Sequence, residues 1–278
     1  MRTLILYAYC ENQKGNLKNK NSKENLLFFL NNGLINNDNY IFCININGEH
    51  SIDFSKYQKK YSNLRIYNGY GKCQLDGWNN IINDQSNDYY NYDYYHFITD
   101  KVSGPYNKEE LQPNWIEYIN KHINNSNIII GSYGTSPHGK LFKFPYYTMK
   151  FFCINNKIFH FLLNKEIFKK LRYDTTDNNE HSIDKIKEIK LSYILLNNDI
   201  QYESITKNGI NKVEFINEYK DKDWDKLFSI TKQLHSINDI DMKDRIFWTG
   251  TTMHKVFTDE KYHEKITIPR STDKLGKW

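Results

Sequence analysis

The chain has 278 residues, of which 39% are hydrophobic and 26% are charged, a composition typical of a globular protein and not of a disordered one. Its net charge of +5 comes from Lys and Arg interleaved with acids, without the long basic run of a nucleic-acid-binding stripe. We therefore expect no nucleic-acid partner. The four cysteines (Cys10, Cys43, Cys73 and Cys153) form no C-x-x-C pair, which argues against structural zinc and a disulfide scaffold.

The chain begins with a short apolar stretch, Thr3 to Tyr9, which we interpret as a strand buried on both faces of a parallel sheet. The stretch is too short to span a membrane, is followed at once by polar residues, and lacks a signal-peptide cleavage pattern. No other stretch approaches membrane-spanning length. The sequence therefore predicts a soluble, cytoplasmic protein without a transmembrane segment.

Apolar strand-like segments then alternate with helix-like segments up to residue 100. Further strands are predicted at 40–46, 63–67 and 92–99, helices at 24–31 and 75–82, and a polar helix-like segment at 51–61. Alternation of this kind is typical of βαβ units. It predicts an α/β fold in which helices flank a mainly parallel sheet.

The pattern changes beyond residue 105. Helices are predicted at 115–122, 165–171 and 183–196, a strand is predicted at 128–131, and residues 150–161 mix aromatic and apolar side chains. From residue 208 onward the chain is weakly patterned, and it contains no clear linker or repeat. We expect one domain over residues 1–207 and a C-terminal extension, 208–278, packed on the same domain.

Three predicted strands end in polar or glycine-rich residues, which are Tyr9-Cys10-Glu11, Asn68-Gly69-Tyr70-Gly71 and Thr99-Asp100-Lys101. Ligands of open α/β sheets bind beyond the carboxyl ends of the strands. An acidic residue directly after a buried strand can hold a divalent ion that neutralises a diphosphate leaving group. Asp100 is the residue that best fits this role.

Two segments around these strand ends resemble a known family. The stretches YNGYGKCQLDGWNNII at 67–82 and YDYYHFITDKVSGPY at 92–106 resemble the donor-binding half of GT-A glycosyltransferases. They are most similar to the glycosyltransferase-like proteins of polysaccharide and rhamnan synthesis, including viral ones. Within the second stretch, Asp100, Val102, Gly104 and Pro105 match the family pattern, and Ser103 stands where the family usually has Arg.

The resemblance implies a GT-A-like (Rossmann-like) glycosyltransferase. Such an enzyme transfers a sugar from a UDP- or dTDP-sugar to a glycan or glycoconjugate acceptor. By this resemblance and by their place at strand ends, the donor-binding candidates are Tyr7, Tyr9, Asn68, Gly69, Gly71, Asp76 and Lys101. The competing interpretations are core packing for Tyr7 and Tyr9, a simple turn for Asn68, Gly69 and Gly71, and a solvated acid in the first turn of a helix for Asp76.

A metal cofactor, Mn²⁺ or Mg²⁺, is also implied, although the usual Asp-x-Asp motif is incomplete. Asp100 is present, but Val102 replaces the second carboxylate. Either the ion is held by Asp100, the diphosphate and water, or Lys101 neutralises the diphosphate with little or no metal. The competing interpretation of Asp100 is a helix N-cap or turn residue.

The catalytic base is less well marked. An inverting transfer requires a carboxylate or imidazole near the acceptor hydroxyl. Glu188 has the best placement by resemblance, and an ordinary acid on a helix surface is its competing interpretation. Other candidates for the base are Asp174, Asp177, Glu180 and His181. His138 and His254 lie in loop-like contexts; the resemblance implies that a late His can complete the metal shell, and an ordinary surface residue is the competing interpretation.

Two other functions fit the same features. A nucleotidyltransferase that makes a nucleotide-sugar shares a parallel sheet and a metal-diphosphate site, but residues 9–23 carry no recognisable glycine- and basic-rich signature. A non-catalytic glycan-binding or capsid-associated protein that kept the fold is favoured by the incomplete metal motif and by Ser103 in place of Arg.

Overall fold

The computed structural model describes residues 1–10, 22–69, 74–84, 89–105, 114–130, 133–134, 146–147, 149–168, 191–192, 194–195, 197–206 and 209–213. The strands of the main sheet are β1 (Thr3–Tyr9), β2 (Tyr40–Asn47), β3 (Leu64–Gly69), β4 (Tyr94–Thr99), β5 (Asn127–Ile130), β8 (Phe151–Asn155), β9 (Gln201–Thr206) and β10 (Gly209–Val213). A separate small sheet pairs β6 (Tyr133–Gly134) with β7 (Tyr146–Tyr147). The helices are α1 (Ser22–Asn32), α2 (Ser55–Lys60), α3 (Gln74–Ile82), α4 (Trp115–Asn120) and α5 (Asn156–Asn164).

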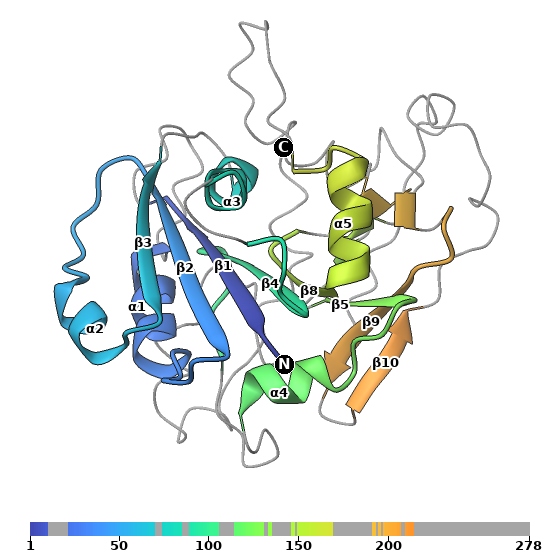
Figure 1. Cartoon of the computed structure of the whole chain (residues 1–278), viewed down its shortest axis with the longest axis horizontal. Coiled ribbons are helices and arrows are strands. Elements are labelled where there is room, and N and C mark those ends of the chain that lie inside the picture. Colours follow the sequence, from blue (N-terminus) through green and yellow to red (C-terminus); the bar gives the residue numbers. More distant parts are fainter. Residues whose placement is uncertain are drawn as a thin grey trace, which may run out of the picture.

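The strands of the main sheet lie in the order β10-β9-β5-β8-β4-β1-β2-β3 (Figure 1). β1 pairs in parallel with β2 and with β4, β2 pairs in parallel with β3, and β5 with β9. β8 runs antiparallel to both of its neighbours, and β10 runs antiparallel to β9. Since β1 to β5 and β9 all run in one direction, the predicted α/β fold with a mainly parallel sheet is confirmed.

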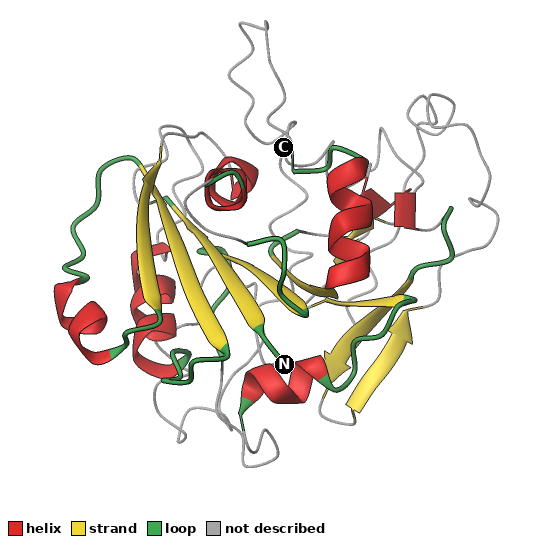
Figure 2. Ribbon diagram, viewed as in Figure 1, coloured by secondary structure: helices red, strands yellow, loops and turns green. Residues whose placement is uncertain are grey.

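Helices cover both faces of the sheet (Figure 2). On one face, Ile5 and its odd-numbered neighbours in β1 pack in a core with Leu26 of α1 and Trp115 of α4. On the other face, Leu6 and its even-numbered neighbours pack in a second core with Trp78 of α3 and with α5. Successive residues of a strand point to opposite faces, and β1 is buried along its whole length. This explains the unbroken apolar sequence of the first strand.

The structure confirms the elements predicted before residue 105, with their ends shifted by a few residues. In contrast, the helix predicted at 165–171 is wrong over its described part, because α5 ends at Asn164 and residues 165–168 form a turn. Glu166 adopts a left-handed backbone with φ of 55°, and the N–H of Ile167 donates to the carbonyl of Leu162. Ile167 and Phe168 thus pack on the core from a turn, and their apolar character does not indicate a helix.

The sequence did not predict β9 and β10, which pair antiparallel at one edge of the main sheet. The boundary predicted between residues 207 and 208 falls between these two strands. β10 therefore belongs to the same sheet as β1 to β5. None of the helices that the structure describes is long and apolar enough to cross a membrane.

Candidate functional site

The carboxyl ends of β1, β2, β3 and β4 meet at one edge of the sheet, which we call the carboxyl edge. In the register of these strands, Ala8 lies beside Thr99, and Asn47 lies beside Gly69. Asp100 follows directly after β4 and therefore lies next to the end of β1. Ligands of open α/β sheets bind beyond this edge, so Asp100 lies where the sequence predicts a site.

Asp100 is 3% exposed, and neighbouring segments hold it through both its backbone and its side chain. Its N–H donates to the carbonyl of Ala8 at 3.0 Å, and its Oδ2 accepts the N–H of Cys10 at 2.9 Å. Its own carbonyl accepts Nδ2 of Asn25 in α1 at 2.8 Å. The carboxyl group is thus held by the residue that follows β1, and the backbone of Asp100 is held by α1.

The electrostatics of this position oppose ionisation of the carboxyl group. Burial raises the pKa of Asp100 above its ordinary value, because the charged form loses water. The Cys10 amide, the positive charge of Lys101 and the Ser22 hydroxyl each lower the pKa, although the Ser22 hydroxyl falls short of hydrogen-bond geometry. The net effect is a raised pKa, which a cation or another hydrogen-bond donor near the carboxylate would reverse.

Lys150, which directly precedes β8, stabilises the end of β4 on the side opposite β1. The backbone N–H and the Oγ1 of Thr99 both donate to the carbonyl of Lys150, at 3.0 and 3.1 Å. Thr99 Oγ1 in turn accepts the N–H of Lys101 at 3.3 Å. Lys101 itself is partly exposed.

The residues after Lys101 that match the family pattern have a packing role. Residues 102–105 are all buried. A Cβ on Gly33, at the end of α1, would lie 2.8 Å from Cδ of Pro105 and 2.7 Å from Cδ2 of Phe29. Because only a glycine fits this contact, the segment after Asp100 docks closely on α1. Val102, Gly104 and Pro105, which match the family pattern, thus help to hold the end of β4 against α1.

A second group of polar side chains lies between β2, β3 and α3. Nδ2 of Asn45 donates to Oδ1 of Asn47 at 2.7 Å. Within the described residues, Oδ1 of Asn45 and Nδ2 of Asn80 are buried without a hydrogen-bond partner. A Cβ on Gly69 would lie 2.6 Å from the first atom and 2.2 Å from the second, so both converge on this glycine. Packing therefore accounts for a glycine at position 69, beside any role in donor binding.

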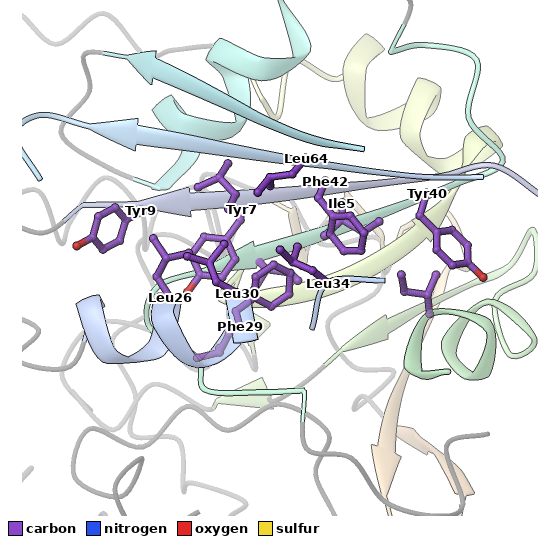
Figure 3. Close-up of a cluster of buried hydrophobic side chains, with 14 of the residues drawn as sticks. Ile5, Tyr7, Tyr9, Leu26, Phe29, Leu30, Leu34, Tyr40, Phe42 and Leu64 are labelled. Atoms are coloured by element: carbon purple, nitrogen blue, oxygen red, sulfur yellow. The ribbon is translucent and has the colours of Figure 1, made fainter. Parts of the chain in front are cut away.

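The two tyrosines proposed to contact the donor lie in the core of the α1 face. Tyr7 is 1% exposed and Tyr9 is buried completely. The Tyr7 ring packs against Phe29 of α1, with ring centroids 5.0 Å apart. Figure 3 shows Tyr7 between β1 and α1, with Leu26 and Leu30 beside it. In this conformation neither ring is available to stack on a base.

Two other predicted donor contacts differ in their exposure to solvent. Asn68 is exposed, whereas Asp76 lies in the first turn of α3 and is 8% exposed. The remaining candidates lie outside the described residues, and they are Gly71, Asp174, Asp177, Glu180, His181, Glu188, His138 and His254.

Sequence reasoning missed the buried amides Asn25 and Asn45. Asn25 lies on the buried face of α1 beside Leu26, in a helix whose apolar residues the sequence does show. Asn45 interrupts the apolar run of β2, where every residue from 42 to 47 is buried. A polar side chain on a predicted core face signals a buried hydrogen bond. That signal was present in both segments.

The residues at the carboxyl edge fit a metal ion only in part. Among the residues that the structure describes, no three His, Cys, Asp or Glu side chains are grouped to hold an ion. Asp100 offers one carboxylate, one of whose oxygens already accepts the Cys10 amide. Mg²⁺ is commonly held by one or two carboxylates together with substrate phosphates. Asp100 therefore suits an ion that arrives with a diphosphate, and not a preformed protein cage.

No protein-family model and no curated protein matches this sequence. Among solved structures, residues 1–349 of TarS from S. aureus match with a TM-score of 0.38 and 12% identity, over 68% of this chain and 55% of that chain. The chain therefore spans about half of the TarS fragment. The same fragment in complex with UDP matches with a TM-score of 0.36 and 11% identity, over 71% of this chain and 54% of that one.

A further match is 4-diphosphocytidyl-2C-methyl-D-erythritol synthase from Anaerococcus prevotii. Its TM-score is 0.41 and its identity is 12%, over 78% of this chain and 92% of that chain. All of these scores and identities are low. The likenesses carry no argument about the activity of this chain, which depends on its own residues.

Proposed function

We propose that this protein is a glycosyltransferase that transfers a sugar from a UDP- or dTDP-sugar to a glycan or glycoconjugate acceptor. The observation that carries the proposal is Asp100, a buried carboxyl group fixed at the carboxyl edge between β1 and β4. The resemblance of residues 67–82 and 92–106 to the donor-binding half of GT-A glycosyltransferases supports it.

In this proposal, residues of the chain help to neutralise the negative charge of the nucleoside diphosphate leaving group. Asp100 orients a divalent ion, Mn²⁺ or Mg²⁺, and the ion supplies charge neutralisation at the diphosphate when bound. Lys101 is placed directly after Asp100 and adds a second positive charge. Asn68, Gly69, Gly71 and Asp76 remain proposed donor contacts, and Glu188 remains the proposed base.

Asp100→Asn tests the assignment with little change in shape, because the amide oxygen can still accept the Cys10 N–H. Loss of the charge should reduce donor turnover roughly a hundredfold, as removal of one electrostatic group at a reacting centre commonly does. The measurement is release of UDP or dTDP from a panel of nucleotide-sugars, with and without Mn²⁺.

Asp93→Asn is the matched control. Asp93 precedes β4, and its Oδ2 accepts the N–H of Arg2 at 2.7 Å, so it makes the same bond at the opposite end of the same strands. This variant should keep full turnover. Full activity of Asp100→Asn would sink the assignment. Release of pyrophosphate from a nucleoside triphosphate would point instead to a nucleotidyltransferase, and absence of any nucleotide binding to a glycan-binding protein.

A further inference from the structure

Asparagine is frequent in this chain, but only Asn124 is followed, two positions later, by Ser or Thr with a residue other than Pro between them. The sequence Asn124-Asn125-Ser126 therefore matches the acceptor pattern for N-glycosylation. It lies in the connection between α4 and β5, and all three residues are exposed. Because so short a pattern also arises by chance, the geometry of this turn decides whether it can act as an acceptor.

The Asn124 side chain is folded onto Ser126. Its Oδ1 accepts two hydrogen bonds, one from the backbone N–H of Ser126 at 2.8 Å and one from the Ser126 hydroxyl at 2.7 Å. Among the residues that the structure describes, no group bonds to Nδ2 of Asn124. The amide oxygen is therefore held by two donors, while the amide nitrogen stays open to a reaction partner from solvent.

This arrangement favours reaction at the amide nitrogen. In N-glycosylation, Nδ2 forms a bond to C1 of a sugar and loses one proton to a base of the transferase. The bond between C1 and a diphosphate oxygen breaks, and the diphosphate leaves with the electron pair. As the proton departs, negative charge shifts onto Oδ1 of the amide. The two Ser126 donors lie where this charge develops and stabilise it, as the donors of an oxyanion hole do.

Neighbouring residues hold the turn in this conformation. The N–H of Asn124 donates to Oδ1 of the buried Asn127 at 2.7 Å, and Nδ2 of Asn155 donates to the carbonyl of Asn124 at 2.7 Å and to Oδ1 of Asn125 at 2.9 Å. β5 begins directly after the turn and runs in the direction of β1 and β4, so the turn lies at the opposite end of the sheet from Asp100. A bulky sugar on Asn124 would therefore leave the carboxyl edge open.

We propose that Asn124 is an acceptor for N-linked glycosylation and that Ser126 is its positioning residue. The donor is a sugar joined through C1 to a diphosphate, which a nucleotide or a lipid carries. The inference goes beyond the proposed function and does not depend on it, because a separate transferase performs the reaction.

The test exposes the folded full chain to the two kinds of donor in separate reactions. One contains UDP-glucose and a soluble N-glycosyltransferase, and the other contains a lipid-linked oligosaccharide and a membrane oligosaccharyltransferase. Peptide mass spectrometry should find a sugar on Asn124 in at least one reaction, which identifies the kind of donor. Asn37 is an internal control, because its Oδ1 accepts the N–H of Asn39 at 2.9 Å but position 39 offers no hydroxyl. It should stay unmodified.

Ser126→Ala keeps the backbone donor and removes the hydroxyl. Modification should fall by about tenfold or more, because a hydrogen bond to a developing charge is lost, whereas Ser126→Thr should keep it. Ser126 is exposed, so neither variant should shift the thermal midpoint, and a lost acceptor can be told from a lost fold. An unmodified Asn124 in both reactions would overturn the inference, and so would equal modification of the wild type and Ser126→Ala.

Discussion

The two ends of the β1–β4 strand pair carry the same contact in different surroundings. At the amino end, Oδ2 of Asp93 accepts the N–H of Arg2, and at the carboxyl end, Oδ2 of Asp100 accepts the N–H of Cys10. Asp93 is exposed, whereas Asp100 is 3% exposed. Water stabilises the first carboxylate and not the second. The bond to Asp93 therefore only links the two strands. The bond to Asp100 also holds a carboxyl group at a buried position, where its ionised form is destabilised.

The buried polar side chains differ in the same way. At the amino end, Nε2 of His96 is bonded to Oδ1 of Asn120 at 2.8 Å, and Nδ2 of Asn120 donates to Oγ1 of Thr3 at 2.9 Å. His96 Nδ1 has no partner within the described part of the chain, but the ring is held through its other nitrogen. Near Asp100, the only polar side-chain groups of Tyr7 and Ser22 have no hydrogen-bond partner among the residues that the structure describes. This contrast agrees with the proposed function, in which the carboxyl end holds a ligand and the amino end contributes stability.

The largest effect on stability is expected at the amino end, from the pH dependence of His96. Burial lowers the pKa of His96 from 6.5 to about 4, and the hydrogen bond to Asn120 only partly opposes this. The unfolded chain takes up the proton first, so stability is complete above pH 6.5 and is lost as the pH falls towards 4. The free energy of unfolding should drop by about 3 kcal/mol over this range, which urea titrations at several pH values measure.

The variant His96→Gln isolates the contribution of His96 protonation to stability. The glutamine amide can donate to Oδ1 of Asn120 and does not titrate. Carboxyl groups also titrate over the same range, and the raised pKa of Asp100 works in the opposite direction. The difference between wild type and variant cancels these shared contributions. The same pH dependence in both proteins would contradict the assignment of the drop to His96.

At the carboxyl edge, Gly69→Ala should destabilise the protein by about 2 kcal/mol, because the added Cβ overlaps Nδ2 of Asn80 and Oδ1 of Asn45. Shortening Asn80 in the double variant Gly69→Ala, Asn80→Ala should recover part of the loss. Urea unfolding of the single and double variants measures both effects. A fully stable Gly69→Ala would show that the two amides move aside, and that packing does not explain the glycine.

The sequence predicts the part of the site that depends on local pattern. Mainly apolar runs identify the central strands because these strands are buried on both faces, and Asp100 is found because it follows such a run. The bond between Asn25 and Asp100 joins residues 75 positions apart, and the convergence of Asn45 and Asn80 depends on how α3 packs on the sheet. Contacts of this kind follow from register and docking, which no local pattern encodes.

The smallest effect we predict concerns the link between α1 and Asp100. Asn25 and Asn32 lie on the same helix, and each donates through Nδ2 to a backbone carbonyl, that of Asp100 at 2.8 Å and that of Phe28 at 2.9 Å. The first bond is buried and the second is exposed. Asn25→Ala should therefore lower the free energy of unfolding by about 1–2 kcal/mol, because a buried carbonyl loses its donor, whereas Asn32→Ala should change it by less than about 0.5 kcal/mol.

Urea unfolding of the two variants measures the difference, and it bears directly on the contrast between the two ends of the strand pair. If α1 holds the carboxyl edge in place, Asn25→Ala should also weaken the binding of a nucleotide such as UDP, while Asn32→Ala should not. Equal losses of stability in the two variants would mean that burial adds nothing to the bond with Asp100. The carboxyl edge would then be held by β1 and β8 alone, through the contacts of Cys10 and Lys150.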